Sequence, residues 1–236
     1  MRPRPSLCAR GARGPRPSHA RALPARAPEA QRQALEAVSI DPAFAYRRAL
    51  RAELPGVAIV LDPFHLVRGA NGALDTVRRE RQRFRRRARP LSSEQRSGGF
   101  RPELWHSRRR LLKAGERLAE RERRALCELF QAEPLLAEAW GLKERFRAIY
   151  RSRDRAEAER RLRAFEAAVE RAAIPSFTAF AHGLRGWREE LLAYFDQPTT
   201  NGYAEGVINK IKVIKRRAYG LPSFDGFRTR VLVACG

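Results

Sequence analysis

Two short apolar runs in the first third of the chain have the pattern of buried β-strands. Residues 37–40 and 57–61 are rich in β-branched side chains and are bounded by turn-forming residues. A helix fits between them and a long basic helix follows to about residue 88, so the two strands are predicted to be parallel. Because two parallel strands do not make a stable sheet unaided, we expect the strands that should neighbour them to be missing from this chain.

An Asp-Pro pair follows each of these runs. The pairs at Asp41 and Asp62 favour an Asp at a helix N-cap and a Pro at the first helical position. An Asp at the carboxyl end of a parallel strand also lies where α/β sheets place their ligands, and it can coordinate Mg²⁺. The residues alone favour capping for both. His65, one turn into the second helix, is interpreted as structural, and the histidines are too widely spread to predict a cluster: His19, His65, His106 and His182.

Residues 104–195 have the periodicity of packed helices. Leucine and aromatic residues recur three and four positions apart, which predicts one core-facing stripe on each helix. Residues 92–99 are the best linker candidate, and the expected helix boundaries are Pro134, Pro175 and Pro198. The predicted divisions are a disordered Arg/Ala/Pro-rich arm (1–31), an α/β unit (32–89), a helical block (90–197) and C-terminal helices (198–236).

The most informative stretch of the chain is its C-terminal segment, residues 200–217. At 100° per residue Glu205 falls on one helix face with Asn209, Lys212 and Arg216, while aliphatic side chains cover the opposite face. A carboxylate that leads a basic stripe suits a helix-borne ligand in metal-assisted phosphoryl transfer. An acid near a helix N-terminus with a solvated basic face behind it is the plainer interpretation, and the residues alone favour it.

The charge balance of the chain indicates a polyanionic partner. Its 236 residues include 49 Lys and Arg against 26 Asp and Glu, a formal net charge of +23. A field of this sign concentrates nucleic acid around the molecule. The apolar runs are too short to span a bilayer, so no membrane partner is expected. Three scattered cysteines match neither a disulfide framework nor a four-ligand zinc site, which favours a reducing compartment.

Three blocks of the sequence resemble one known family. They read DPFHLVRGAN at residues 62–71, NGYAEGVINKIK at 201–212, and YG followed by FDGFR between 219 and 228. In this order they resemble the catalytic half of bacterial insertion-sequence transposases of the ISL-three (ISL3) family, over roughly residues 33–236. The resemblance implies DNA transposition. Its expected partners are the insertion-sequence ends and the target DNA, in the bacterial cytoplasm at the nucleoid, with a homo-oligomer as a candidate assembly.

The resemblance also implies a catalytic set. DDE transposases have an RNase H-like core in which two Asp and one Glu hold two divalent ions, Mg²⁺ or Mn²⁺. On this resemblance, residues 38–40 are the fourth strand of that core, Asp41 is the second acid and Glu205 the third. Asp62 is the alternative second acid; otherwise Asp62 and His65 match an Asp/Cys-x-x-His signature and are supporting residues.

The fold class expected is therefore α/β, a partial RNase H-like fold with two parallel strands retained and a large all-helical insertion, predominantly helical by content. Two metal ions would support hydrolysis followed by strand transfer. Trp187 and Tyr219 are expected in the core rather than stacked on bases. The side chains expected to position the DNA backbone are Asn209, Lys210, Lys212, Lys215, Arg216 and Arg217.

The first acid of the implied triad has no counterpart in this sequence. Family members carry it on a strand before the equivalent of Val38, and the Arg/Ala/Pro-rich arm contains no Asp. We expect a truncated transposase that performs no strand transfer as an isolated chain. The alternative is a non-catalytic nucleic-acid-binding protein derived from a transposase. Its DNA binding would persist in Glu205→Gln and weaken by roughly 0.9 log units per log unit of salt for each phosphate neutralised.

Overall fold

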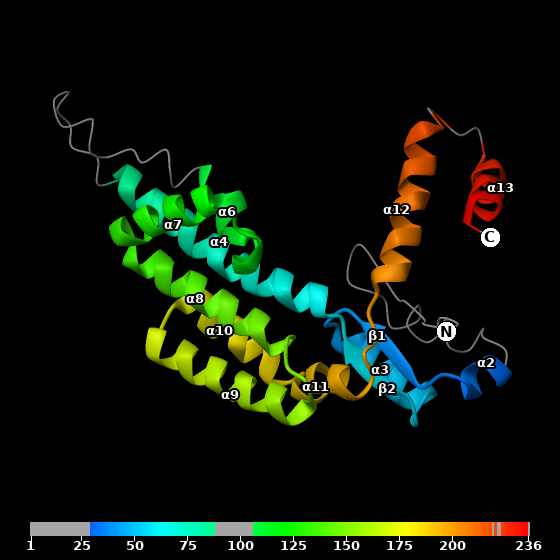
Figure 1. The fold of residues 1–236 in the computed structure, drawn as a ribbon. Helices are drawn as coiled ribbons and strands as arrows, with labels where there is room; N and C mark the ends of the chain where they lie inside the picture. The colour runs from blue at the N-terminus through cyan, green and yellow to red at the C-terminus, as the bar shows by residue number, and fades with distance from the viewer. Residues whose placement is uncertain (1–28, 88–105, 219, 221–222, 236) are drawn as a thin grey trace. The chain divides into compact units, whose positions relative to one another are not determined.

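The computed structural model describes residues 29–87, 106–218, 220 and 223–235 (Figure 1). Two compact units are formed, one from the described parts of residues 1–62 and 197–236, the other from residues 63–196. The predicted linker at 92–99 and most of the predicted arm lie outside the described residues. The domain division expected from the sequence stays a prediction.

The first unit contains two paired strands and four helices: α2 (Glu29–Gln33), β1 (Ala37–Ile40), α3 (Phe44–Glu53), β2 (Ala58–Leu61), α12 (Gly202–Arg217) and α13 (Phe224–Cys235). The strands pair in parallel, with Ala37 opposite Ala58 and Ile40 opposite Leu61. This confirms the parallel pair predicted from the apolar runs, although β2 begins one residue later than expected. The strand side chains are buried on both faces, as a covered parallel sheet requires.

Two local predictions in this unit are corrected by the structure. Helix α2 begins at Glu29, inside the segment expected to be disordered, where Glu29 forms an ion pair with Arg32 one turn later. Helix α3 begins at Phe44 with Ala43 at its N-cap, so the prediction that Asp41 caps this helix is wrong. The chain stays extended at Ala43 before it turns into the helix. Helix α4 begins at Pro63, as predicted, so Asp62 directly precedes the helix, and capping by its side chain stays a prediction.

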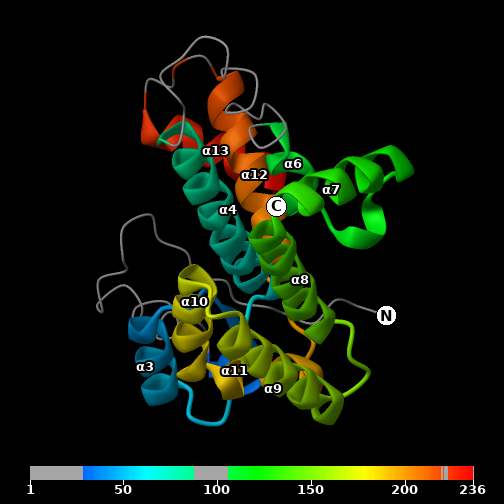
Figure 2. The same cartoon turned by 90° about the vertical axis from the view of Figure 1, so that its left-hand side faces the viewer.

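The second unit is helical throughout its described residues. Its elements are α4 (Pro63–Arg87), α6 (Arg108–Leu112), the 3-10 turn η2 (Gly115–Arg117), α7 (Glu120–Ala132), α8 (Pro134–Ile149), α9 (Arg155–Ala172), α10 (Pro175–Arg185) and α11 (Arg188–Asp196). Pro134 and Pro175 each open a helix and Pro198 follows the end of α11, as predicted. Helix α4 packs against α8 and α10, and α8 packs against α9 (Figure 2). Most residues of the apolar stripes predicted from the sequence are buried or half-buried in this core, but the prediction was wrong for Leu135, which is 41% exposed.

Two buried charges that the sequence analysis did not single out fix helix ends in this unit. The Glu133 carboxylate, fully buried, accepts hydrogen bonds from Arg81 at 2.8 Å and Arg85 at 2.7 Å, which ties α4 to the junction of α7 and α8. The Lys143 ammonium, also fully buried, donates to the carbonyls of Leu111 and Lys113, both at 2.9 Å. Burial lowers the pKa of the Lys143 amine. Each buried charge has hydrogen-bonding partners that offset the cost of removing it from water. The two charges can therefore hold neighbouring helices together.

Gly69, in the first of the family-like sequence blocks, lies where α4 meets α10. A Cβ at this position would come 2.7 Å from Cε2 of Phe180, a ring that itself packs on Phe146 and Phe165. Gly69→Ala is therefore expected to destabilise the protein by about 1–3 kcal/mol, because the Phe180 ring would have to shift from its packing on Phe146 and Phe165. Urea unfolding followed by circular dichroism measures this change.

Gly72 offers a matched control on the same helix. A Cβ there meets nothing within 4 Å, so Gly72→Ala is expected to leave stability unchanged or raise it by up to about 1 kcal/mol, since Ala is the better helix former. If both substitutions change the free energy of unfolding equally, close packing at Gly69 is not the reason for its glycine.

Candidate metal site

The parallel register brings the ends of the two strands, and the aspartates that follow them, to one edge of the sheet. Ile40 and Leu61 are the last paired residues. The pairing continues one step further, because the Asp62 amide donates to the Ile40 carbonyl at 3.0 Å. Asp41 and Asp62 therefore leave the sheet side by side, as the carboxyl ends of neighbouring parallel strands must.

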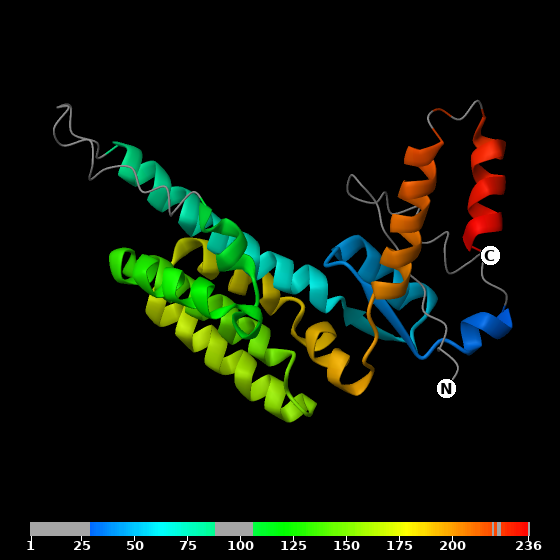
Figure 3. The same cartoon turned by 45° about the horizontal axis from the view of Figure 1, so that its top comes forward.

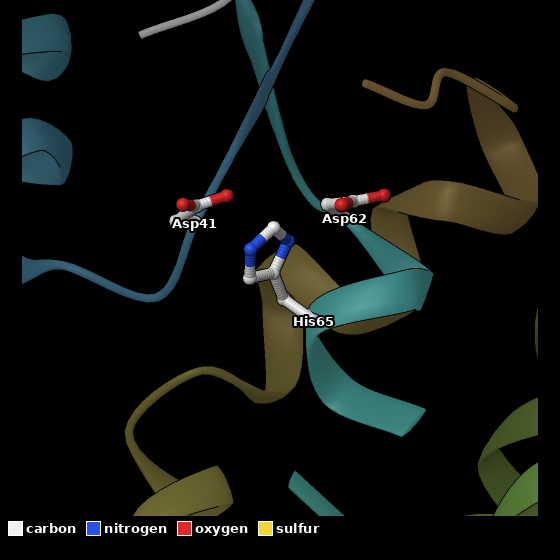
Figure 4. A group of neighbouring side chains, drawn as sticks. All are labelled: Asp41, Asp62 and His65. Carbon is white, nitrogen blue, oxygen red and sulfur yellow. The ribbon is translucent and has the colours of Figure 1, made fainter. Parts of the chain in front are cut away.

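His65 joins these two aspartates from the first turn of α4, three residues beyond Asp62 (Figure 4). One ligand atom each from Asp41, Asp62 and His65 lies within 4.8 Å of the other two. Asp62 is 2% exposed, whereas Asp41 and His65 are half-buried. The cluster thus combines two carboxylates and an imidazole.

The chemistry of this donor set fits a divalent metal ion. Carboxylate oxygens suit Mg²⁺ and Mn²⁺, and an imidazole nitrogen suits transition ions. Asp62 also stands at the N-terminus of α4, where the positive end of the helix favours a negative charge. Asp41 has no such explanation, because it is not a cap. The arrangement defines an α/β protein with a candidate metal site at the strand ends.

Glu205, the third acid expected from the resemblance, lies in the first turn of α12 and is half-buried. Its amide donates to the carbonyl of Asn201 at 2.8 Å, which starts the helix. Glu205 belongs to the same compact unit as Asp41. It is not one of the three residues in the cluster of Asp41, Asp62 and His65, so its approach to Asp41 stays a prediction.

The two-sided character predicted for residues 202–217 is confirmed. The polar side chains of α12 are exposed: Asn209, Lys210, Lys212, Lys215, Arg216 and Arg217. The aliphatic residues predicted for the opposite side are half-buried: Val207, Ile208, Ile211 and Ile214; Val213 of the same helix is 41% exposed. Helices α12 and α13 lie side by side (Figure 3), and the Lys210 ammonium donates to the Ala234 carbonyl of α13. Lys210 therefore helps to hold α13, while the other five polar side chains remain exposed, and three of them share the face of Glu205: Asn209, Lys212 and Arg216.

Trp187 is 3% exposed, which confirms that it is a core residue. The prediction for Tyr219 lies outside the described residues. Cys127 and Cys235 are free thiols. Among the described helices, none combines the length and the apolarity that a membrane span requires.

The sequence paired Asp62 with His65 in one family-like signature and offered Asp41 as a second acid, but it did not predict that the three side chains meet. The signal was present in the parallel pairing, because two strands that run in register deliver the residues after them to one place. The helix that begins directly after Asp62 then returns His65 to the same place one turn later.

Comparison with known proteins identifies the family. A model of the DDE transposases of the ISL3 family, described as "Transposase", matches residues 17–231. The transposase for insertion sequence element IS1001 of Bordetella parapertussis is 30% identical over 216 residues, which cover 91% of this chain and 51% of that protein. Transposases for element IS1557 from two Mycobacterium tuberculosis strains are 28% identical over 201 residues, covering 79% of this chain and 44% of theirs.

The chain spans about half the length of these curated relatives. No solved structure matches it significantly. The match to the family model covers most of the chain, and the chain belongs to the ISL3 family of transposases.

Proposed function

We propose that this chain is the catalytic portion of an ISL3-family transposase and that it works in DNA transposition by metal-dependent phosphoryl transfer. The observation that carries the proposal is the cluster of Asp41, Asp62 and His65 at the ends of two parallel strands. The two strands and the helices after them would be part of an RNase H-like core. Residues 90–197 would be a helical insertion in that core.

Asp41 is the better candidate for the second acid of the triad. It ends β1 without capping α3, and its half-buried carboxylate can reach both an ion and a DNA phosphate. Asp62 is 2% exposed and directly precedes α4, where the helix N-terminus favours a negative charge without any metal ion. Asp62 is therefore proposed as a supporting residue.

Glu205 is the proposed third acid. A bound pair of Mg²⁺ or Mn²⁺ ions would supply an activated water or 3′-hydroxyl and would stabilise the leaving oxygen. In this proposal Asp41 and Glu205 hold the ions, and the exposed basic side chains of α12 bind the phosphates next to them. The chain supplies two of the three acids, so strand transfer by the isolated 236-residue chain is not expected.

Metal-directed cleavage of the protein tests this site without requiring activity. Fe²⁺ with ascorbate and hydrogen peroxide produces hydroxyl radicals at the bound ion, and these cut the backbone nearby. We expect cuts in three regions, near residue 41, at residues 62–65 and near residue 205, with excess Mg²⁺ suppressing all three. Mass spectrometry of the fragments locates the cuts.

Glu205→Gln is expected to weaken the cutting in all three regions, whereas Glu128→Gln, which changes an exposed glutamate on α7, leaves it unchanged. Cuts near 41 and 62–65 without any near 205 would remove Glu205 from the site. A chain that binds DNA through α12 but shows no metal-directed cut would instead be the non-catalytic DNA-binding protein, the second candidate function.

A further inference from the structure

His65 occupies a distinctive place in the cluster of Asp41, Asp62 and His65. Its ring lies between the two aspartates, with one ring nitrogen facing each of them (Figure 4). The three ligand atoms are within 4.8 Å of one another. Ligands about 2.1 Å from a shared ion lie up to about 4.2 Å apart, so shifts of less than about an ångström would let one ion contact both Asp41 and His65.

We propose that His65 is a nitrogen ligand of the metal ion held at Asp41 and that Asp62 orients its imidazole. The proposal rests on the metal site of the proposed function. A metal-bound histidine commonly has a carboxylate at its other ring nitrogen, which fixes the tautomer and the ring orientation. Asp62 stands on the far side of the ring from Asp41, is buried, and is held by the start of α4. It is therefore a rigid partner for this task.

A nitrogen ligand changes which metal the site prefers. Mg²⁺ favours oxygen ligands and keeps several waters, whereas imidazole nitrogen favours first-row transition ions. The site is therefore expected to bind Mn²⁺ more tightly than Mg²⁺, and His65 is the residue that makes this difference. A site built from carboxylates alone is expected to show a smaller preference for Mn²⁺.

Pulsed electron paramagnetic resonance of the full chain with Mn²⁺ tests the proposal directly. A histidine ligand gives the bound ion a ¹⁴N modulation, which changes to a ¹⁵N pattern when only histidine is isotopically labelled. We expect this signal in the unaltered chain and its loss in His65→Gln. Because labelling needs no substitution, the result does not depend on whether the variant folds.

His65→Gln is expected to raise the dissociation constant for Mn²⁺ at least about 10-fold. Removing a residue that only hydrogen-bonds a metal ligand already weakens metal binding by about this factor. The constant for Mg²⁺ should change by less than about 3-fold, because Gln still offers an oxygen. His182→Gln, an exposed histidine on α10, is the matched control and should change neither.

Asp62 is a positioning residue in this proposal, so its test reads the ring itself. ¹⁵N nuclear magnetic resonance of the metal-free chain should show a single His65 tautomer, which becomes a mixture in Asp62→Asn. An unchanged tautomer in that variant would overturn the role of Asp62. A Mn²⁺ ion that depends on Asp41 but lacks nitrogen coupling would overturn the role of His65 and leave the proposed function standing. Absence of any Asp41-dependent Mn²⁺ binding would overturn both.

Discussion

Asp41→Asn is expected to raise the dissociation constant for Mn²⁺ at least about 100-fold. Asn keeps the size of the side chain and one oxygen, but it removes the negative charge that compensates the ion, and affinity in such sites follows the number of charged ligands. Removing a residue that only hydrogen-bonds a metal ligand lowers metal affinity roughly 10- to 100-fold. Removing a charged ligand itself should lower the affinity by at least the larger of these factors. Titration of free Mn²⁺ by electron paramagnetic resonance gives the constant.

The matched control is Asp154→Asn. Asp154 caps α9, where its carboxylate accepts the Glu157 amide at 2.7 Å, and Asn caps a helix equally well. This variant should bind Mn²⁺ like the unaltered chain and retain its stability. If Asp41→Asn behaves in the same way as Asp154→Asn, Asp41 is not a metal ligand and the proposed catalytic site is lost.

A second measurement uses a complete enzyme. A chimera joins this chain to the part of the Bordetella parapertussis transposase that it does not match, which under the proposed function would supply the first acid. In a chimera that transposes, Asp41→Asn should reduce transposition at least about 100-fold, a loss typical of a single electrostatic contact to the transition state. Equal transposition with and without the substitution would contradict the proposed role.

Phe146→Ala is expected to destabilise the helical unit of residues 63–196 by about 3–5 kcal/mol. Phe146 is fully buried and its ring centroid lies 5.0 Å from Phe180, 5.2 Å from Phe165 and 6.1 Å from Tyr150. Removal of the ring leaves a cavity among aromatic neighbours on three helices, which cannot collapse independently. The melting temperature should fall by roughly 10–20 °C, measured by circular dichroism at 222 nm.

Phe84→Ala is the control for this substitution. Phe84 is 57% exposed on α4, and its contact in the structure is the Arg81 guanidinium over its ring, 5.0 Å from the centroid. An exposed contact of this kind is worth about 0.5–1 kcal/mol. If Phe146→Ala lowers the free energy of unfolding no more than Phe84→Ala does, the aromatic cluster around Phe146 does not contribute substantially to the stability of this unit.

The local elements of this protein could be predicted where hydrophobic pattern and helix-start signals agree. The strands at β1 and β2 and the helix starts at Pro134 and Pro175 follow from apolar runs and from the fixed backbone angle of proline. The start of α3 was predicted wrongly because the Asp-Pro signal is local. It cannot register that the chain bends at Pro42 and is extended at Ala43 before the helix begins.

The charges buried in the helical unit could not be predicted in the same way. Lys143 and Glu133 look like ordinary surface residues in the sequence, because their partners lie about 30 to 50 positions away. A pattern of neighbouring residues contains no information about such distant contacts. These buried interactions can be recognised only in the packed structure, where the helices exclude water from both the charged group and its partner.

By itself, the sequence determined the family, the helical content, the parallel strand pair and the two-sided character of α12, because each depends on the order and spacing of residues along the chain. Only the tertiary structure decided that Asp41, Asp62 and His65 share one point and that Asp41 is not a cap. The physical reason is that strand register and the direction of the next helix fix how far apart side chains lie in space. A pattern along the chain fixes only their order.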